Sequence, residues 1–130
     1  MALLLEDDTG ARQDAFAHDA GGGVLTLLLD HPALGALETA YRLDLTAYRR
    51  SDAWQPLALL HDTTHALATA VGAGVRAGAL ERCRVTTEAA GMHFHESYYA
   101  EDLPDDLRSI LAMLRLAELR GAARVRWLVA

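Results

Sequence analysis

The chain has 130 residues, 52% of them hydrophobic, which is enough for one domain with its own core, so we treat residues 1–130 as a single unit. The formal net charge of −6 argues against a nucleic-acid binder, because affinity for phosphates comes mainly from clustered basic residues. The single cysteine, Cys83, excludes an intramolecular disulfide, and no apolar run approaches the roughly 18 residues of a membrane span. We therefore expect a cytoplasmic protein.

The basic and acidic residues are distributed unevenly along the chain. All twelve basic residues are arginine, a bias that fits a high-GC bacterial genome, so the absence of lysine indicates no chemistry. Six acidic residues fall within residues 1–30, whereas five arginines fall within residues 108–130. We expect these two ends to be neighbours in the fold and to neutralise each other.

The first thirty residues predict a three-stranded antiparallel meander. Residues 2–5 are apolar and are followed by "EDDTG", in which Gly10 suits a turn that needs positive φ. The segment "ARQDAFA" can return as a second strand. After the glycine run at 21–23, "VLTLLLD" (24–30) is apolar at nearly every position, which favours a central strand.

Two helices are expected in the middle of the chain. One begins at Pro32, capped by Asp30 or His31, and ends near residue 50. Its expected buried stripe consists of Leu34, Leu37, Tyr41, Leu45 and Tyr48. The other runs from about Pro56 to Arg82, with Thr64 among leucines and valines on its apolar face. A break of this helix near Gly72 is the alternative.

The last third predicts a hairpin, a helix and a strand. The segment "CRVTTEAAGMHFHESYY" (83–99) alternates as a hairpin does, and the acidic residues after it favour a helix start near residue 102. Gly121 is the expected residue after that helix, before the strand "ARVRWLV" (123–129). Val125, Trp127 and Val129 should face inward, and Arg124 and Arg126 outward. The resulting order, βββααββαβ, predicts an α+β fold in which helices pack on one face of a mostly antiparallel sheet.

Two histidine pairs are the candidate site for metal chemistry. His61 and His65 are spaced by one helical turn, and His93 and His95 fall on one side of a strand. Four imidazoles brought together would suit zinc, and an open zinc site would activate water for hydrolysis. Both pairs also occupy positions where ordinary polar residues lie, and "HDTTH" (61–65) lacks the glutamate of the HExxH motif. A zinc-binding protein or zinc-dependent hydrolase is therefore the alternative function.

The leading interpretation is a non-catalytic module that self-associates or binds another protein. His93, His95, Ser97 and Tyr99 form an outward row of aromatic, imidazole and hydroxyl groups, which suits an interaction surface. The last strand, "RVRWLVA", is a second candidate, because an unpaired edge strand can pair across a dimer. This interpretation expects a homodimer or a protein partner and needs no cofactor.

Overall fold

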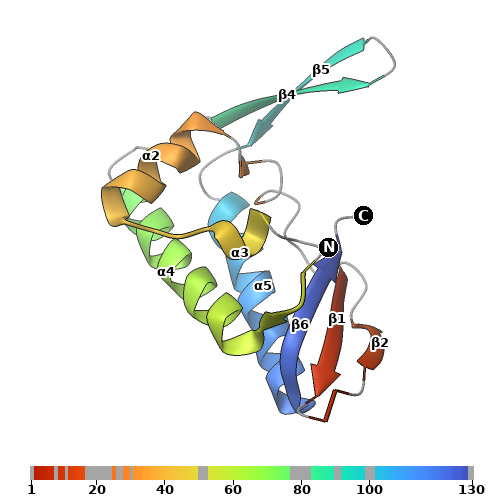
Figure 1. Cartoon of the computed structure of the whole chain (residues 1–130). Coiled ribbons are helices and arrows are strands. Elements are labelled where there is room, and N and C mark those ends of the chain that lie inside the picture. The colour runs from red at the N-terminus through yellow and green to blue at the C-terminus, as the bar shows by residue number, and fades with distance from the viewer. Residues whose placement is uncertain are drawn as a thin grey trace.

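The computed structural model describes residues 2–7, 9–10, 12–16, 25, 28–29, 31–49, 53–76, 83–89, 92–98 and 102–128. These residues form an α+β fold of antiparallel strands and helices (Figure 1). In chain order the elements are β1 (Ala2–Asp7), β2 (Arg12–Phe16), α2 (Pro32–Tyr41), α3 (Thr46–Arg49), β3 (Gln55–Pro56), α4 (Leu57–Arg76), β4 (Cys83–Ala89), β5 (Met92–Tyr98), α5 (Asp102–Leu119) and β6 (Ala122–Leu128).

The larger sheet has the strand order β2-β1-β6-β3, with every neighbouring pair antiparallel. The turn between β1 and β2 contains Gly10 at φ +84°, which confirms the predicted turn glycine. β6 pairs with β1 from Ala122 to Leu128 and with β3 at Val125 and Arg124. β6 is thus an interior strand of this sheet, and our expectation that the last strand offers a free edge is wrong.

The two ends of the chain meet in this sheet, as their opposite charges predicted. Glu6 of β1 lies directly opposite Arg124 of β6, and Oε1 of Glu6 is 3.8 Å from a guanidinium nitrogen of Arg124. Arg124 points outward as expected, whereas Arg126 is only partly exposed and its Nε is buried. The side chain of Trp127 and the whole of Val129 lie outside the described part of the chain.

The predicted third strand is wrong for the residues that the structure describes. Leu25 and Leu28 have helical conformation, and both are buried. Asp106 of α5 accepts a hydrogen bond from the backbone N–H of Leu25, at 2.8 Å between Oδ2 and N. A run that is apolar at nearly every position has no clear periodicity to separate a buried helical turn from a central strand, and here the packing against the helices decided the outcome.

The expected single helix over 32–50 is two helices. His31 caps α2, because its Nδ1 accepts the N–H of Ala33 at 3.1 Å, as predicted. Arg42 then adopts the left-handed conformation (φ 53°, ψ 47°), which ends the helix. Asp44 begins α3 by accepting the N–H of Thr46 at 3.0 Å. The break lets α3 turn its buried residues toward α4, while the apolar stripe is kept except at Tyr41, which is 46% exposed.

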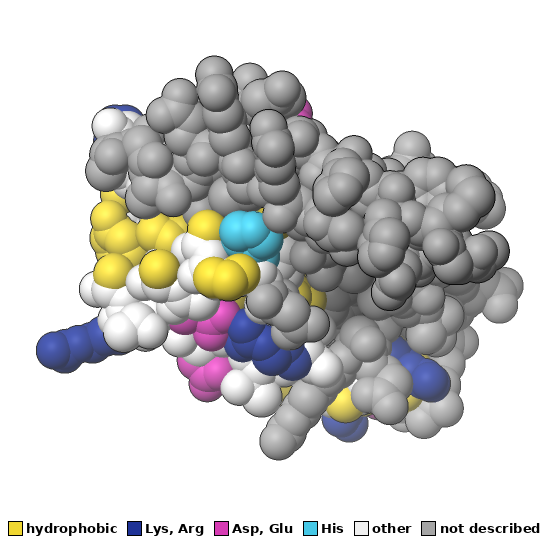
Figure 2. Space-filling model, turned by 90° about the horizontal axis from the view of Figure 1, so that it is seen from above, with side chains coloured by type: hydrophobic (Ala, Val, Ile, Leu, Met, Phe, Trp, Pro, Cys, Tyr) yellow, Lys and Arg dark blue, Asp and Glu magenta, His cyan; other side chains and the backbone are white. Residues whose placement is uncertain are grey.

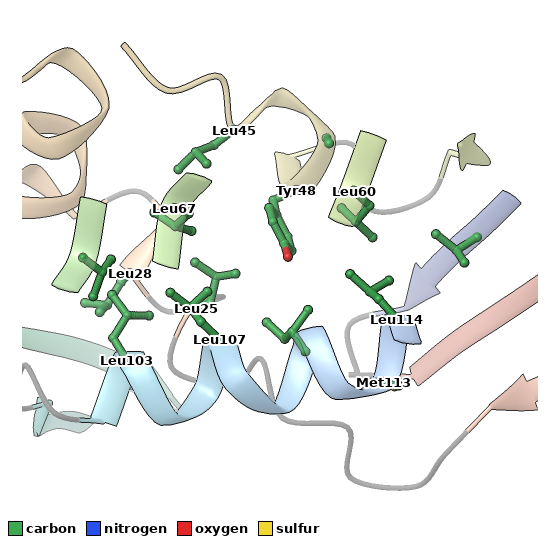
Figure 3. Close-up of a cluster of buried hydrophobic side chains, with 14 of the residues drawn as sticks. Leu25, Leu28, Leu45, Tyr48, Leu60, Leu67, Leu103, Leu107, Met113 and Leu114 are labelled. Carbon is green, nitrogen blue, oxygen red and sulfur yellow. The ribbon is translucent and has the colours of Figure 1, made fainter. Parts of the chain in front are cut away.

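The core lies between the helices and β6. α4 is continuous through Gly72, so the alternative break at this glycine is not present, and the helix packs along α5. Figure 3 shows leucines from both helices pointing toward one another around Tyr48 of α3. The largest fully buried side chains are mostly leucine, and they include Tyr48, Leu25, Leu34, Leu45, Leu60, Leu67, Leu103 and Leu107. α5 is followed by Gly121 at φ +79°, as predicted.

The predicted hairpin is confirmed as a separate two-stranded sheet of β4 and β5. Figure 1 shows it extending away from the body that the helices and the larger sheet form, on the side of α2. In the described part of the face shown in Figure 2, hydrophobic, acidic and basic side chains lie beside one another. None of the helices that the structure describes has the length and hydrophobicity that a membrane span requires.

Candidate functional site

The first histidine pair lies on the outer side of α4. The buried side of this helix carries Leu60, Thr64 and Leu67, so one helical turn places His61 and His65 away from the core. His61 is partly exposed, with its Nδ1 3.7 Å from Oδ1 of the exposed Asp62, and His65 is exposed. Among the described side chains, no three histidine, cysteine, aspartate or glutamate residues are grouped so that they would hold a metal ion.

The second histidine pair belongs to the hairpin. The register places His93 opposite Glu88, and His95 opposite Thr86. Ser97 lies opposite Arg84, so His93, His95 and Ser97 occupy alternate positions along β5. Tyr99 lies outside the described residues.

The two histidine pairs lie on separate parts of the fold. Figure 1 shows the hairpin at one end of the molecule, while the N-terminal half of α4, which carries His61 and His65, runs toward the other end. The strand that carries His93 and His95 therefore lies apart from the part of α4 that carries His61 and His65. The four-histidine zinc centre remains a prediction from the sequence.

His61 instead lines a shallow pocket where α4 begins and α5 ends. The pocket has a volume of about 440 Å³. Its polar groups are the imidazole of His61 and the carboxylates of Asp62 and Glu118, and its apolar part comes from Leu57 and from alanines of α4 and β6. Asp62 and Glu118 are both exposed, so the pocket offers hydrated negative charge beside one imidazole.

A buried polar cluster that the sequence did not indicate, Tyr48 and Thr64, joins α3 to α4. Thr64 of α4 is fully buried and its hydroxyl donates to the carbonyl of Leu60 at 2.6 Å. Because that proton is used, the phenol of Tyr48 is the donor in the hydrogen bond between Tyr48 and Thr64. Burial raises the pKa of the Tyr48 phenol far above its usual range; the hydrogen bond to Thr64 lowers it less, and the charge of Asp106 raises it further. A single threonine on an apolar helix face was the one clue in the sequence.

The cluster is part of the core rather than a reactive site. Tyr48 is 1% exposed and Thr64 is not exposed at all, so neither hydroxyl is presented to a substrate. Asp106 lies at the margin, where its carboxylate holds the backbone of Leu25. The hydrogen bond between Tyr48 and Thr64 therefore ties α3 to α4, and Asp106 separately ties α5 to the segment of Leu25.

The hairpin is amphipathic by its register. One face contains only polar residues, namely Arg84, Thr86, Glu88, His93, His95 and Ser97. The other face is mostly apolar and contains Cys83, Val85, Thr87, Ala89, Met92, Phe94, Glu96 and Tyr98. Within the part of the chain that the structure describes, β4 pairs only with β5 and β5 only with β4.

Comparison with protein-family models, with curated proteins and with solved structures found no match for this chain.

Proposed function

We propose that the chain is a self-associating interaction module whose binding element is the hairpin of β4 and β5. The observation that supports this proposal is that the two strands form a sheet of their own, apart from the four-stranded sheet. Two-stranded hairpins are marginally stable in water, and three or more strands with a hydrophobic face are needed for an independently stable sheet. Association through the hairpin supplies the additional strands.

The pattern of residues along the hairpin suits strand addition. An outer strand carries a row of backbone donors and acceptors that serves as a template for another strand. Val85, Thr86 and Thr87 form a β-branched run at the centre of β4, and such residues favour extended backbone. The apolar face continues across both strands, so a sheet extended by another strand also extends a hydrophobic face.

Sedimentation velocity of the full chain between about 1 and 100 µM tests the proposal. We expect the mass to rise from that of one chain, 14.1 kDa, toward twice that value. Amide hydrogen exchange at both ends of this range locates the contact, and residues 83–98 should become protected as the concentration rises. Sedimentation as a monomer throughout, with unchanged exchange, would contradict the proposal.

A matched pair of substitutions tests whether association uses the hairpin or the exposed apolar end of α5. Phe94→Ser removes a large apolar side chain from the apolar face of the hairpin. Leu119→Ser removes one from the end of α5, where the leucine is 75% exposed. We expect the first variant to remain monomeric and the second to associate as the wild type does. Association lost only in the α5 variant would place the interface at the end of α5 instead.

A further inference from the structure

We propose that the partner of the hairpin is β4 of a second copy, paired antiparallel about a two-fold axis at Thr86. This inference rests on the proposed function and specifies its edge, its symmetry and its register. The candidate edges are the outer sides of β4 and β5, because each strand has one side directed toward the other. The pattern of charges along the two strands distinguishes them.

The backbone of β4 suits a two-fold axis at Thr86. Two residues separate Ala89 from Met92, and in so short a hairpin the closing pair exchanges hydrogen bonds. The alternation of an antiparallel pair then directs the N–H and C=O groups of Arg84, Thr86 and Glu88 away from β5. These three residues are spaced symmetrically about Thr86, so two copies offer each other matching donors and acceptors.

The charges of β4 are complementary in this register. Arg84 lies two residues before Thr86 and Glu88 lies two residues after it, so antiparallel pairing places Arg84 of each copy opposite Glu88 of the other. Opposite charges directly across an antiparallel pair stabilise it, and the two-fold axis produces two such pairs. The centre of the interface then pairs Thr86 with its own copy and Val85 with Thr87.

The same construction on β5 does not give a complementary edge. A two-fold axis at His95, the central residue of β5, pairs the apolar residue Phe94 with the acidic residue Glu96. It also leaves Glu96 without a basic residue across the pair. The charge pattern therefore selects β4.

Pairing through β4 also aligns the apolar faces of the two hairpins. Residues directly opposite each other in a sheet lie on the same face. Because Val85 faces Thr87 of the other copy, the two apolar faces become one face of a four-stranded antiparallel sheet. Four strands with a shared hydrophobic face exceed the three that an independently stable sheet needs.

Charge exchange between two variants of the full chain tests this register. Arg84→Glu gives β4 two acidic positions, and Glu88→Arg gives it two basic positions, so each variant alone places like charges opposite each other. We expect each to self-associate at least about tenfold more weakly than the wild type. A 1:1 mixture places the acidic positions of one chain opposite the basic positions of the other, and we expect its affinity to return to within about threefold of the wild type. Recovery on mixing also shows that both variants fold.

Arg115→Glu, on the exposed face of α5, is the control for a change of net charge, and it should associate as the wild type does. If the wild type dimerises through residues 83–98 but the mixture does not recover, the β4 register is overturned and the proposed function stands. If the wild type is monomeric throughout the concentration range, the proposed function and the β4 register are both refuted. Concentration-dependent protection of the amides of β5 without those of β4 also overturns the β4 register.

Discussion

The hydrogen bond between Tyr48 and Thr64 gives the sharpest prediction about stability. Thr64→Val keeps the shape of the side chain but removes the hydroxyl that accepts the buried phenol of Tyr48, and removing one partner of a buried hydrogen bond costs about 1–3 kcal/mol. Tyr48→Phe removes the donor and leaves the hydrogen bond from Thr64 to Leu60 in place. We expect that change to cost about 0.5–1.5 kcal/mol.

The double variant is the decisive one. Each single variant loses the same hydrogen bond, and the double variant loses it only once, so the combined cost should be about 1 kcal/mol below the sum of the single costs. Urea unfolding at 25 °C and at one fixed protein concentration measures the free energy of unfolding of all four proteins. Additive costs, within about 0.3 kcal/mol, would refute the hydrogen bond between Tyr48 and Thr64.

Thr69→Val is the matched control on the same helix. The hydroxyl of Thr69 donates to the carbonyl of His65 at 3.1 Å, the same bond to the residue four earlier that Thr64 makes. Thr69 is exposed, so water replaces the lost partner, and we expect a change of less than about 0.5 kcal/mol.

Three further predictions follow from the core, the helix ends and the histidines. The pKa of Tyr48 in the folded protein lies above the unfolded value near 10, so the stability that the neutral phenol contributes is fully present below pH 10 and is lost as the pH rises toward the folded pKa. Over that range the free energy of unfolding, measured in urea titrations, should fall by up to about 1.4 kcal/mol per pH unit. Tyr48→Phe should flatten this decline. Gly121 has φ +79°, where a side chain is strained, so Gly121→Ala should cost about 1 kcal/mol in thermal unfolding. Arg42 has φ 53°, so Arg42→Gly should relieve that strain and stabilise the protein by up to about 1 kcal/mol. Effects of the opposite sign would contradict these backbone conformations. Equimolar zinc should leave the melting temperature unchanged, and a shift that disappears in the double variant His61→Ala with His93→Ala would restore the metal-centre hypothesis.

Elements with local sequence markers were predicted correctly. The first turn and the end of α5 each have a glycine at positive φ, because only glycine adopts that conformation without strain. The hairpin of β4 and β5 was visible from its alternation, and the start of α5 from its acidic first turn. These markers act within a few residues of the feature that they specify, so a local reading of the sequence recovers them.

The two errors over residues 24–50, the third strand and the single helix, arose where local markers conflict or are absent. Around Leu25 and Leu28 the sequence is apolar except at Thr26, so it has no clear periodicity that would separate a helix from a strand. In the predicted helix over 32–50, the spacing of apolar residues persists through the break at Arg42. A non-glycine residue in the left-handed region has no simple sequence marker.

The segment "HDTTH" shows what the sequence decides and what the tertiary structure decides. Its helical periodicity alone places Thr64 on the buried side and His61 and His65 on the outer side, because burial follows the 3.6-residue period. Only the tertiary structure decided that Thr64 meets Tyr48, that β6 is an interior strand, and that the histidines of the hairpin lie apart from those of α4. Such contacts join residues far apart in sequence, and the packing of whole elements determines them, whereas periodicity reports only which side of an element is buried.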